Sequence, residues 1–170
     1  MNIATIMISS VVIIAFLGLG AIVFLPEQVH VERKKIITGK PKQILELAAS
    51  NEGYQKFNPY LTEDPNLLIR KFGPETGIGS GFYFDGKDGK GSQTVAEITN
   101  DTVKYDIDLG LKGKPTQSIS AVVTDNGTLV TWSAHMKMGM NPIARLIGLF
   151  MDSMIGPTFE LGLDNLEAAV

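Results

Sequence analysis

The chain begins with an unbroken apolar run and continues with short segments in which apolar and polar residues alternate. The run extends from Ile3 to Leu25, 23 residues whose only polar members are one threonine and two serines, with no charged residue among them. As a helix rising about 1.5 Å per residue it would measure roughly 34 Å, enough to cross a hydrocarbon core of about 30 Å. Pro26 would end that helix. The pattern predicts a transmembrane anchor over residues 1–26 and a folded domain over residues 27–170.

Two alternatives to an uncleaved anchor are a cleavable signal peptide and a buried core helix. A signal peptide has a basic start, an apolar stretch of about 7–15 residues and a small-residue cleavage site, and the sequence has none of these. A domain of this size seldom surrounds a helix that is apolar on every side. The sequence therefore predicts a single-pass membrane protein. The cations Arg33, Lys34, Lys35, Lys40 and Lys42 after the run favour a cytosolic domain, although a folded domain can translocate regardless of its charge.

Seven strand-like segments follow the apolar run, separated by clusters of glycine, proline, asparagine and aspartate. The connections after Phe72 are short, which favours antiparallel neighbours because parallel strands need long crossovers. Asn126-Gly127 is a strong signal for a hairpin turn. The predicted strands are Val29–Thr38, Leu67–Phe72, Gly81–Asp85, Ser92–Thr99, Val103–Leu109, Gln117–Thr124 and Thr128–Met136.

Helical spacing occurs between the first two strands and again in the C-terminal tail. The proline-started segment Pro41–Ala49 and the stretch Asn51–Phe57 predict two short helices. The tail has apolar residues spaced by threes and fours, which predicts one long helix with an apolar face. Gly156-Pro157 is expected to kink or divide that helix, because proline lacks the N–H donor and clashes with the preceding turn. The order of these elements predicts an α+β domain.

The alternation along the strands fixes which side chains face the long helix. Several of these positions carry small or hydroxylated residues opposite aromatic ones, which indicates a space that is not filled to normal packing density. An apolar space with a few hydroxyls is typical of a small-molecule pocket. The alternative is that the large side chains of the tail helix fill the space. The small residues predicted to face inward are Ser92, Thr94, Ala96, Ala121 and Ala134.

Charge and composition exclude several classes of function. The net charge is −3 and no long basic run occurs, so a nucleic-acid partner is not expected. The absence of cysteine excludes disulfides, thiolate metal sites and thiol nucleophiles. His30 and His135 are the only histidines, and neither has the spacing of a metal-binding pair. No metal, cofactor or catalytic residue is predicted.

Methionines gather where the last predicted strand leads into the tail helix. Thioether side chains adapt to varied apolar partners, so this cluster is a candidate for gating a ligand or contacting a membrane. Plain packing is the alternative. The residues are Met136, Met138, Met140, Met151 and Met154.

Several stretches of the sequence resemble the SRPBCC superfamily, which includes START-like and polyketide cyclase/dehydrase-like proteins. They are FNPYLTEDPN from Phe57, the glycine-rich run Gly73–Val95, GTLVTWSAHM from Gly127 and GLFMDSMIGPTFELGLDNL from Gly148. The resemblance covers about residues 29–169 and is closest to bacterial members that carry an N-terminal membrane helix. It implies a helix-grip fold, in which a seven-stranded antiparallel sheet curls around a long C-terminal helix over a cavity for hydrophobic ligands. Phe57 and Tyr60 stand where the family usually has two tryptophans.

These observations favour a membrane-anchored protein that binds a hydrophobic small molecule or lipid in an internal cavity. One alternative is a polyketide cyclase/dehydrase-like enzyme in which Tyr60 or Tyr105 donates a proton. Another is a membrane-bound interaction module that docks a partner or the bilayer through the segment Ile143–Ile155. The residues predicted to bind the ligand are Phe57, Tyr60, Phe82, Phe84, Thr94, Trp132, Phe150 and Met154.

Overall fold

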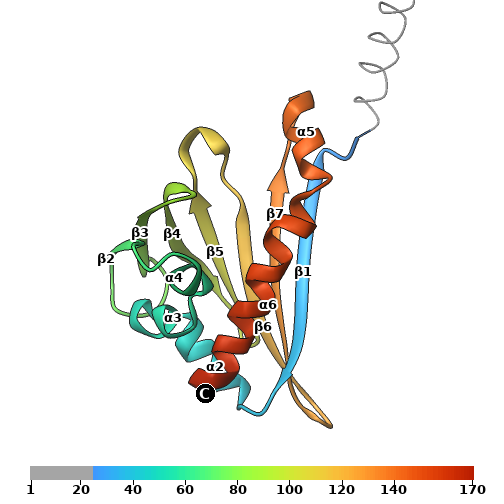
Figure 1. Ribbon diagram of the computed structural model, residues 1–170. Coiled ribbons are helices and arrows are strands. Elements are labelled where there is room, and N and C mark those ends of the chain that lie inside the picture. The colour runs from blue at the N-terminus through green and yellow to red at the C-terminus, as the bar shows by residue number, and fades with distance from the viewer. Residues whose placement is uncertain (1–24) are drawn as a thin grey trace, which may run out of the picture.

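A computed structural model describes residues 25–170 of the chain, so nearly all of the predicted membrane segment lies outside the described residues. The seven strands form a single antiparallel sheet in the order β1-β7-β6-β5-β4-β3-β2. The long helix α6 (Met151–Ala169) crosses one face of this sheet, and the short helices α2, α3 and α4 lie on the same side (Figure 1). This is the α+β helix-grip architecture that the sequence predicts.

All seven predicted strands are present, with ends that differ by a few residues from the prediction. Because neighbours are antiparallel, the start of β1, the end of β7 and the β3–β4 and β5–β6 connections lie at one edge of the sheet. We call this the N-terminal edge, since the described chain begins there. The strands are β1 (Gln28–Ile37), β2 (Leu68–Phe72), β3 (Gly81–Gly86), β4 (Gly89–Ile98), β5 (Thr102–Asp108), β6 (Thr116–Thr124) and β7 (Gly127–Lys137).

The face predicted for most of β4 is wrong. Ile98 pairs with Val103, an inward residue of β5, but the register shifts between Val95 and Glu97. This bulge reverses the alternation, because a slip of one residue moves each side chain to the other face. Val95 is therefore buried beneath the helices, whereas Thr94 pairs with outward-facing residues on the other face of the sheet.

The helices begin at the expected signals, with one addition. Helix α2 (Pro41–Ala48) starts at a proline, and the Ser50 side chain caps α3 (Asn51–Phe57) by accepting from the Gly53 N–H at 3.1 Å. A further helix, α4 (Pro59–Glu63), was not predicted. The Asn58 side chain accepts from the Tyr60 N–H there, and Pro59 occupies the first turn. Asparagine followed by proline is a normal helix start, but five residues are too few to show helical spacing.

The tail divides at a different place from the one predicted. Helix α6 continues through Pro157 without being divided, and the break lies at Leu149 and Phe150, between α6 and the short helix α5 (Pro142–Gly148). Gly156 allows the Arg33 side chain to lie against α6, since a Cβ at this position would meet the guanidinium at 1.9 Å. Among the described residues no single helix is long and apolar enough to cross a membrane, although α5 and α6 reach that length and composition as a pair bent by 48°.

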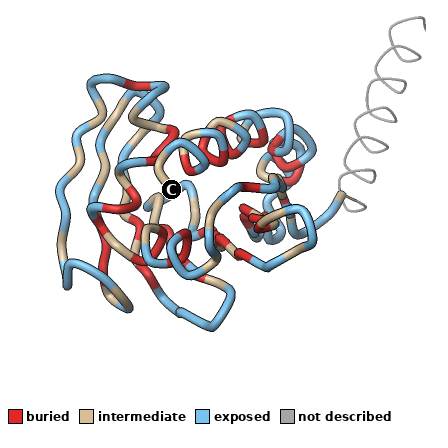
Figure 2. Tube along the Cα trace, turned by 90° about the horizontal axis from the view of Figure 1, so that it is seen from below, coloured by how far each residue is buried: buried red, intermediate tan, exposed pale blue. Residues whose placement is uncertain are grey.

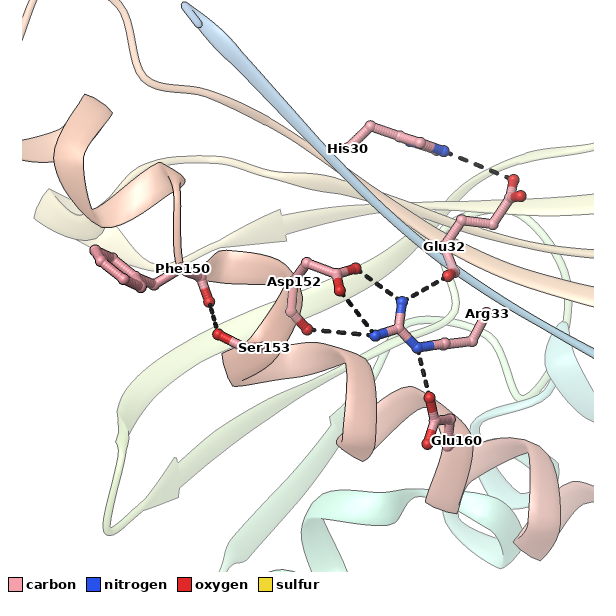
Figure 3. Close-up of polar contacts among 7 residues, drawn as sticks. All are labelled: His30, Glu32, Arg33, Phe150, Asp152, Ser153 and Glu160. Carbon is pink, nitrogen blue, oxygen red and sulfur yellow. Dashed lines mark hydrogen bonds and ion pairs between the residues drawn. The ribbon is translucent and has the colours of Figure 1, made fainter. Parts of the chain in front are cut away.

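Arg33 fastens α6 to the first strand. Its guanidinium donates to Asp152 at 2.8 and 3.0 Å and to Glu160 at 2.6 Å, carboxylates that lie two turns apart on α6 (Figure 3). Both contacts raise the pKa of Arg33, the Asp152 hydrogen bond most. The planar guanidinium suits such a two-carboxylate contact better than an ammonium would. This attachment holds the middle of α6 on the sheet despite the proline.

The core lies between α6, the short helices and the inner face of the sheet, where the buried positions gather (Figure 2). Trp132 of β7 is fully buried at its centre and stacks on Phe159 of α6, with ring centroids 5.3 Å apart. Phe57 and Tyr54 contact the same indole edge-on at 5.8 and 6.1 Å. A Cβ at Gly162 would meet the indole at 2.4 Å, so this glycine brings α6 close to the sheet.

Candidate functional site

A cavity of about 230 Å³ lies between the inner face of the sheet and helices α3, α4 and α6. Its inner end is formed by buried side chains, and its mouth by the exposed β3–β4 turn and the β5–β6 connection. Both of these connections belong to the N-terminal edge of the sheet. Apolar walls come from β3, β5, β7 and the first turns of α6. They include Phe82, Phe84, Ile107, Leu109, Ala134, Met136, Met151 and Ile155.

The inner end of the cavity carries a small group of polar atoms. Tyr54, Gln93 and Gln117 line it and are all buried. The Tyr54 hydroxyl has no hydrogen-bond partner among the described residues. Burial raises the pKa of Tyr54 well above its usual range, and the nearby Gln93 amide opposes this only in part. Because buried hydroxyls are nearly always satisfied, this neutral phenol is a natural partner for a polar group placed in the cavity.

The mouth of the cavity is polar, and hydrogen bonds connect the segments that form it. Lys112 donates from Nζ to the Asp88 carbonyl at 2.8 Å, which links the β5–β6 connection to the β3–β4 turn. Asp64, at the end of α4, accepts from the backbone N–H groups of Lys87 at 2.8 Å and Asn66 at 3.0 Å. The N–H of Lys87 is the main cause that holds the pKa of Asp64 below its usual value. Helix α4 is thereby fastened to the rim of the pocket.

The hydrogen bonds that Asp64 accepts from the backbone of Lys87 and Asn66 are expected to weaken in acid. The folded-state pKa of Asp64 lies below the unfolded value of about 3.9, so its contribution to stability is present above that pH and is lost as the pH falls below it. The thermal unfolding midpoint of the Asp64→Asn variant should lie below that of the unchanged chain at pH 7, and the difference should shrink progressively as the pH falls below about 4. Asp125→Asn, in the turn between β6 and β7, is the control. Parallel curves for the Asp64→Asn variant and the unchanged chain would contradict this role.

Three of the eight residues predicted to bind the ligand line the cavity: Tyr60, Phe82 and Phe84. Phe57 and Trp132 are fully buried in the core behind the wall. The other three do not reach the cavity. Thr94 lies on the opposite face of β4 because of the bulge, and Phe150 and Met154 are exposed to solvent. Helix α6 lines the cavity through Met151 and Ile155.

The polar residues at the inner end were not among those predicted from the sequence. Tyr54 lies three residues before Phe57, which is the spacing of one helix face, and this was the available signal. Gln93 gave none, because the bulge in β4 is not visible in the alternation. Gln117 begins a predicted strand with the parity of the inward residues Ile119 and Ala121, but a buried amide is not expected from hydrophobic patterning.

The two tyrosines considered as proton donors, Tyr60 and Tyr105, lie in different places. Tyr105 donates from its hydroxyl to the Ala48 carbonyl at 2.8 Å and does not line the main cavity. Tyr60 does line it, and burial, together with the charges of Glu63 and Asp88, raises the pKa of its hydroxyl to about 12. Such a phenol stays protonated at neutral pH. Between residues 25 and 170 no cluster of histidine, aspartate or glutamate is suited to hold a metal ion.

Comparison with known proteins places this geometry in a family. A family model described as "Polyketide cyclase / dehydrase and lipid transport" matches residues 28–170. The sequence matches none of the curated proteins. The match includes the whole sheet, all of the helices described above and every residue that lines the cavity.

Solved structures share the fold at low sequence identity. The di-domain ARO/CYC StfQ from the steffimycin biosynthetic pathway superposes with a TM-score of 0.59 at 13% identity, over 83% of this chain and 50% of that one. The chain therefore spans half the length of StfQ. SA2116 from Staphylococcus aureus gives 0.59 at 13% identity, covering 84% of this chain and 93% of its own. Ms6760 from Mycobacterium smegmatis gives 0.59 at 12%, covering 84% and 90%. At these identities the similarity concerns the fold.

Proposed function

Because the chain belongs to the polyketide cyclase/dehydrase and lipid transport family, we propose that it binds a small hydrophobic molecule in this cavity, held at a membrane by its N-terminal segment. The observation that carries the proposal is an apolar cavity whose inner end holds a buried, unpartnered hydroxyl, that of Tyr54. Such a site suits a ligand with an apolar body and one hydrogen-bonding group. The Gln93 and Gln117 amides line the same end and would supply a donor and an acceptor beside the phenol.

The volume of the cavity limits the size of the ligand. An apolar protein cavity of about 150 Å³ holds one benzene molecule. A cavity of about 230 Å³ is half as large again, which suits two fused rings or a short branched chain. A longer acyl chain would have to extend through the mouth, which is formed by the β3–β4 turn and the β5–β6 connection. The ligand class proposed here is therefore a compact phenol, alcohol or ketone, or the end of a lipid.

Binding without catalysis fits the polar groups better than a cyclase or dehydrase reaction does. A proton-transfer mechanism needs a base as well as an acid within reach of the ligand. Of the three carboxylates that line the cavity, Asp88 is exposed in the β3–β4 turn, and the two at the end of α4 already accept hydrogen bonds. Glu63 accepts from the Thr158 hydroxyl at 2.8 Å, and Asp64 accepts from two backbone N–H groups. The tyrosines Tyr54 and Tyr60 remain as donors that orient a ligand.

The proposal is tested by comparing 1-naphthol with naphthalene, which differ by one hydroxyl. A chain without residues 1–24 avoids detergent, in which both probes would dissolve. We expect saturable binding of one 1-naphthol per chain, with naphthalene bound about two- to twelvefold more weakly, since a net hydrogen bond contributes roughly 0.5–1.5 kcal/mol. Calorimetric titration measures both affinities.

Tyr54→Phe should remove the preference for 1-naphthol and leave the affinity for naphthalene unchanged. The variant is expected to fold, because the hydroxyl it removes makes no hydrogen bond. Tyr83→Phe, on an exposed tyrosine of β3, is the matched control. The proposal is wrong if neither probe binds. If both bind but Tyr54→Phe leaves the preference intact, the polar group of the ligand does not lie at this end of the cavity.

A further inference from the structure

An exposed apolar surface covers α5 and the residues on either side of it. Between Lys137 and Asp152 the only charged residue is Arg145, and Arg145 is 5% exposed. Leu111, at the tip of the β5–β6 connection, is fully exposed at the same edge of the sheet. Contiguous exposed apolar surface of this kind marks an interaction site. The α5 surface consists of Met140, Ile143, Leu146, Ile147, Leu149, Phe150 and Met154.

Helix α5 is inverted relative to a normal surface helix, which buries its apolar face. Its charged residue points inward, where the Arg145 guanidinium donates to the carbonyl of Gly139 at 2.7 Å, the carbonyl of Leu25 at 3.2 Å and the carboxylate of Glu27 at 2.7 Å. Gly148 is buried against β1. The apolar side chains are left on the outside. In α6, by contrast, residues such as Phe159 and Leu163 are buried in the core.

The N-terminal apolar run ends against this helix. Leu25 is the last residue of the run, and its carbonyl is bonded to Arg145. The backbone carbonyl of Glu27 also accepts from the N–H of Met138 at 2.8 Å, just before α5. The point where the run meets the domain is therefore fixed beside the α5 surface, at the top of Figure 1. The mouth of the cavity opens at the same edge of the sheet.

We infer that the α5 surface, together with Leu111, lies in the interface of the bilayer that the N-terminal run enters, and that the mouth of the cavity thereby faces the lipid. The inference rests on the membrane anchoring proposed above and extends it to the domain. At seven residues, about 10 Å long, α5 is too short to cross a bilayer, and its one-sided apolar surface suits an interfacial position.

The end of the N-terminal run beside this surface favours a lipid surface over a second copy of the chain or another protein, and the charges at this edge are mixed. Lys112 and Lys114 lie in the β5–β6 connection and Lys137 at the end of β7, all at the N-terminal edge, where Lys114 pairs with Asp108 at 2.8 Å. Lysines next to an interfacial apolar surface match the anionic headgroups of a bilayer. A ligand that partitions into lipid would then reach the cavity without crossing water.

Because the chain contains no cysteine, single cysteines can report the depth of chosen positions. A nitroxide is attached to Ile147→Cys, and separately to Ile143→Cys and Leu111→Cys, in the full chain in vesicles of phosphatidylcholine and phosphatidylglycerol. Val123→Cys is the matched control, since Val123 is 72% exposed and lies near the opposite edge of the sheet. Oxygen collects in lipid and a nickel chelate stays in water. We expect the oxygen-to-nickel accessibility ratio to be several-fold higher at the three test positions than at Val123. Unchanged Trp132 emission checks the fold.

Flotation of the vesicles separates failure of the docking from failure of the anchor. If the chain floats with the vesicles but Ile147 and Ile143 are as accessible to nickel as Val123, the anchor holds and the docking inference is overturned. If the chain does not float, both are overturned, while binding in the cavity is decided by the separate titration. Dipolar broadening between labels at Ile147 that persists on dilution with lipid would place a second copy on this surface and would also overturn the inference.

Discussion

Replacing Trp132 with alanine is expected to lower the free energy of unfolding by about 3–5 kcal/mol, the usual range for a buried tryptophan. The indole is fully buried and stacks on Phe159, and Phe57 contacts its edge. Its Nε1–H also donates to the Gln117 side chain at 3.3 Å. Gly162 brings the backbone of α6 close to the ring. Removal of the indole would leave a void, and α6 could move into it only by giving up its contacts with β1. Urea unfolding followed by circular dichroism measures the change. Tryptophan fluorescence cannot be used, because the variant lacks the only tryptophan of the chain.

The control for this measurement is Val123→Ala on the same sheet. Its side chain is largely exposed, and its replacement should change the stability by no more than about 0.5 kcal/mol. A loss below about 1 kcal/mol for Trp132→Ala, the average for any point mutation, would show that the indole is not the centre of the core. It would also contradict the position of α6 over the sheet.

Filling the cavity from its wall is expected to abolish ligand binding while the fold is kept. Ala134 of β7 is buried and lines the cavity, so a phenylalanine at this position would project into the empty space. We expect Ala134→Phe to weaken 1-naphthol binding by at least about tenfold, or roughly 1.4 kcal/mol. Overpacking a filled core lowers the free energy of unfolding by about 1–3 kcal/mol. We expect a smaller loss for Ala134→Phe in urea unfolding, because the added ring enters empty space.

Thr94→Phe provides the matched control for this substitution. Thr94 was predicted to line the pocket, but it lies on the outer face of β4, where it pairs with Gly81 and Asp106. A phenylalanine at this position should leave the affinity for 1-naphthol unchanged. Equal losses in the two variants would mean that binding depends on the sheet as a whole. Retained binding in Ala134→Phe would place the ligand outside the cavity.

The sheet could be predicted from the sequence because its signals are local. Alternation and turn residues such as Asn126-Gly127 determine each strand and its connection, and short connections leave antiparallel pairing as the natural arrangement. The bulge between Val95 and Glu97 is not local in this sense, because it follows from pairing with β5. It reversed the face predicted for Thr94 and concealed Gln93. A single shift of register therefore changed the composition predicted for the cavity wall.

The tail shows the opposite difficulty, since a strong local signal was overruled by tertiary contacts. Proline can divide a helix, yet α6 continues through Pro157, and Arg33 bonds to carboxylates on both sides of that residue. The true break, after Gly148, has no comparable signal in the sequence. Its position decides that Met151 faces the cavity and that Phe150 is exposed. In the methionine cluster, Met136 and Met151 line the cavity, Met140 and Met154 belong to the α5 surface, and Met138 is buried in the core.

The most direct test of a ligand in this cavity is an NMR titration of the chain without residues 1–24 with 1-naphthol, following the backbone amides. Binding in the cavity should give saturable shifts with one midpoint, largest at Tyr54, Gln93, Gln117 and Ala134, and absent at Thr94. Shifts confined to α5 and the β5–β6 connection, or no saturable shifts at all, would contradict it.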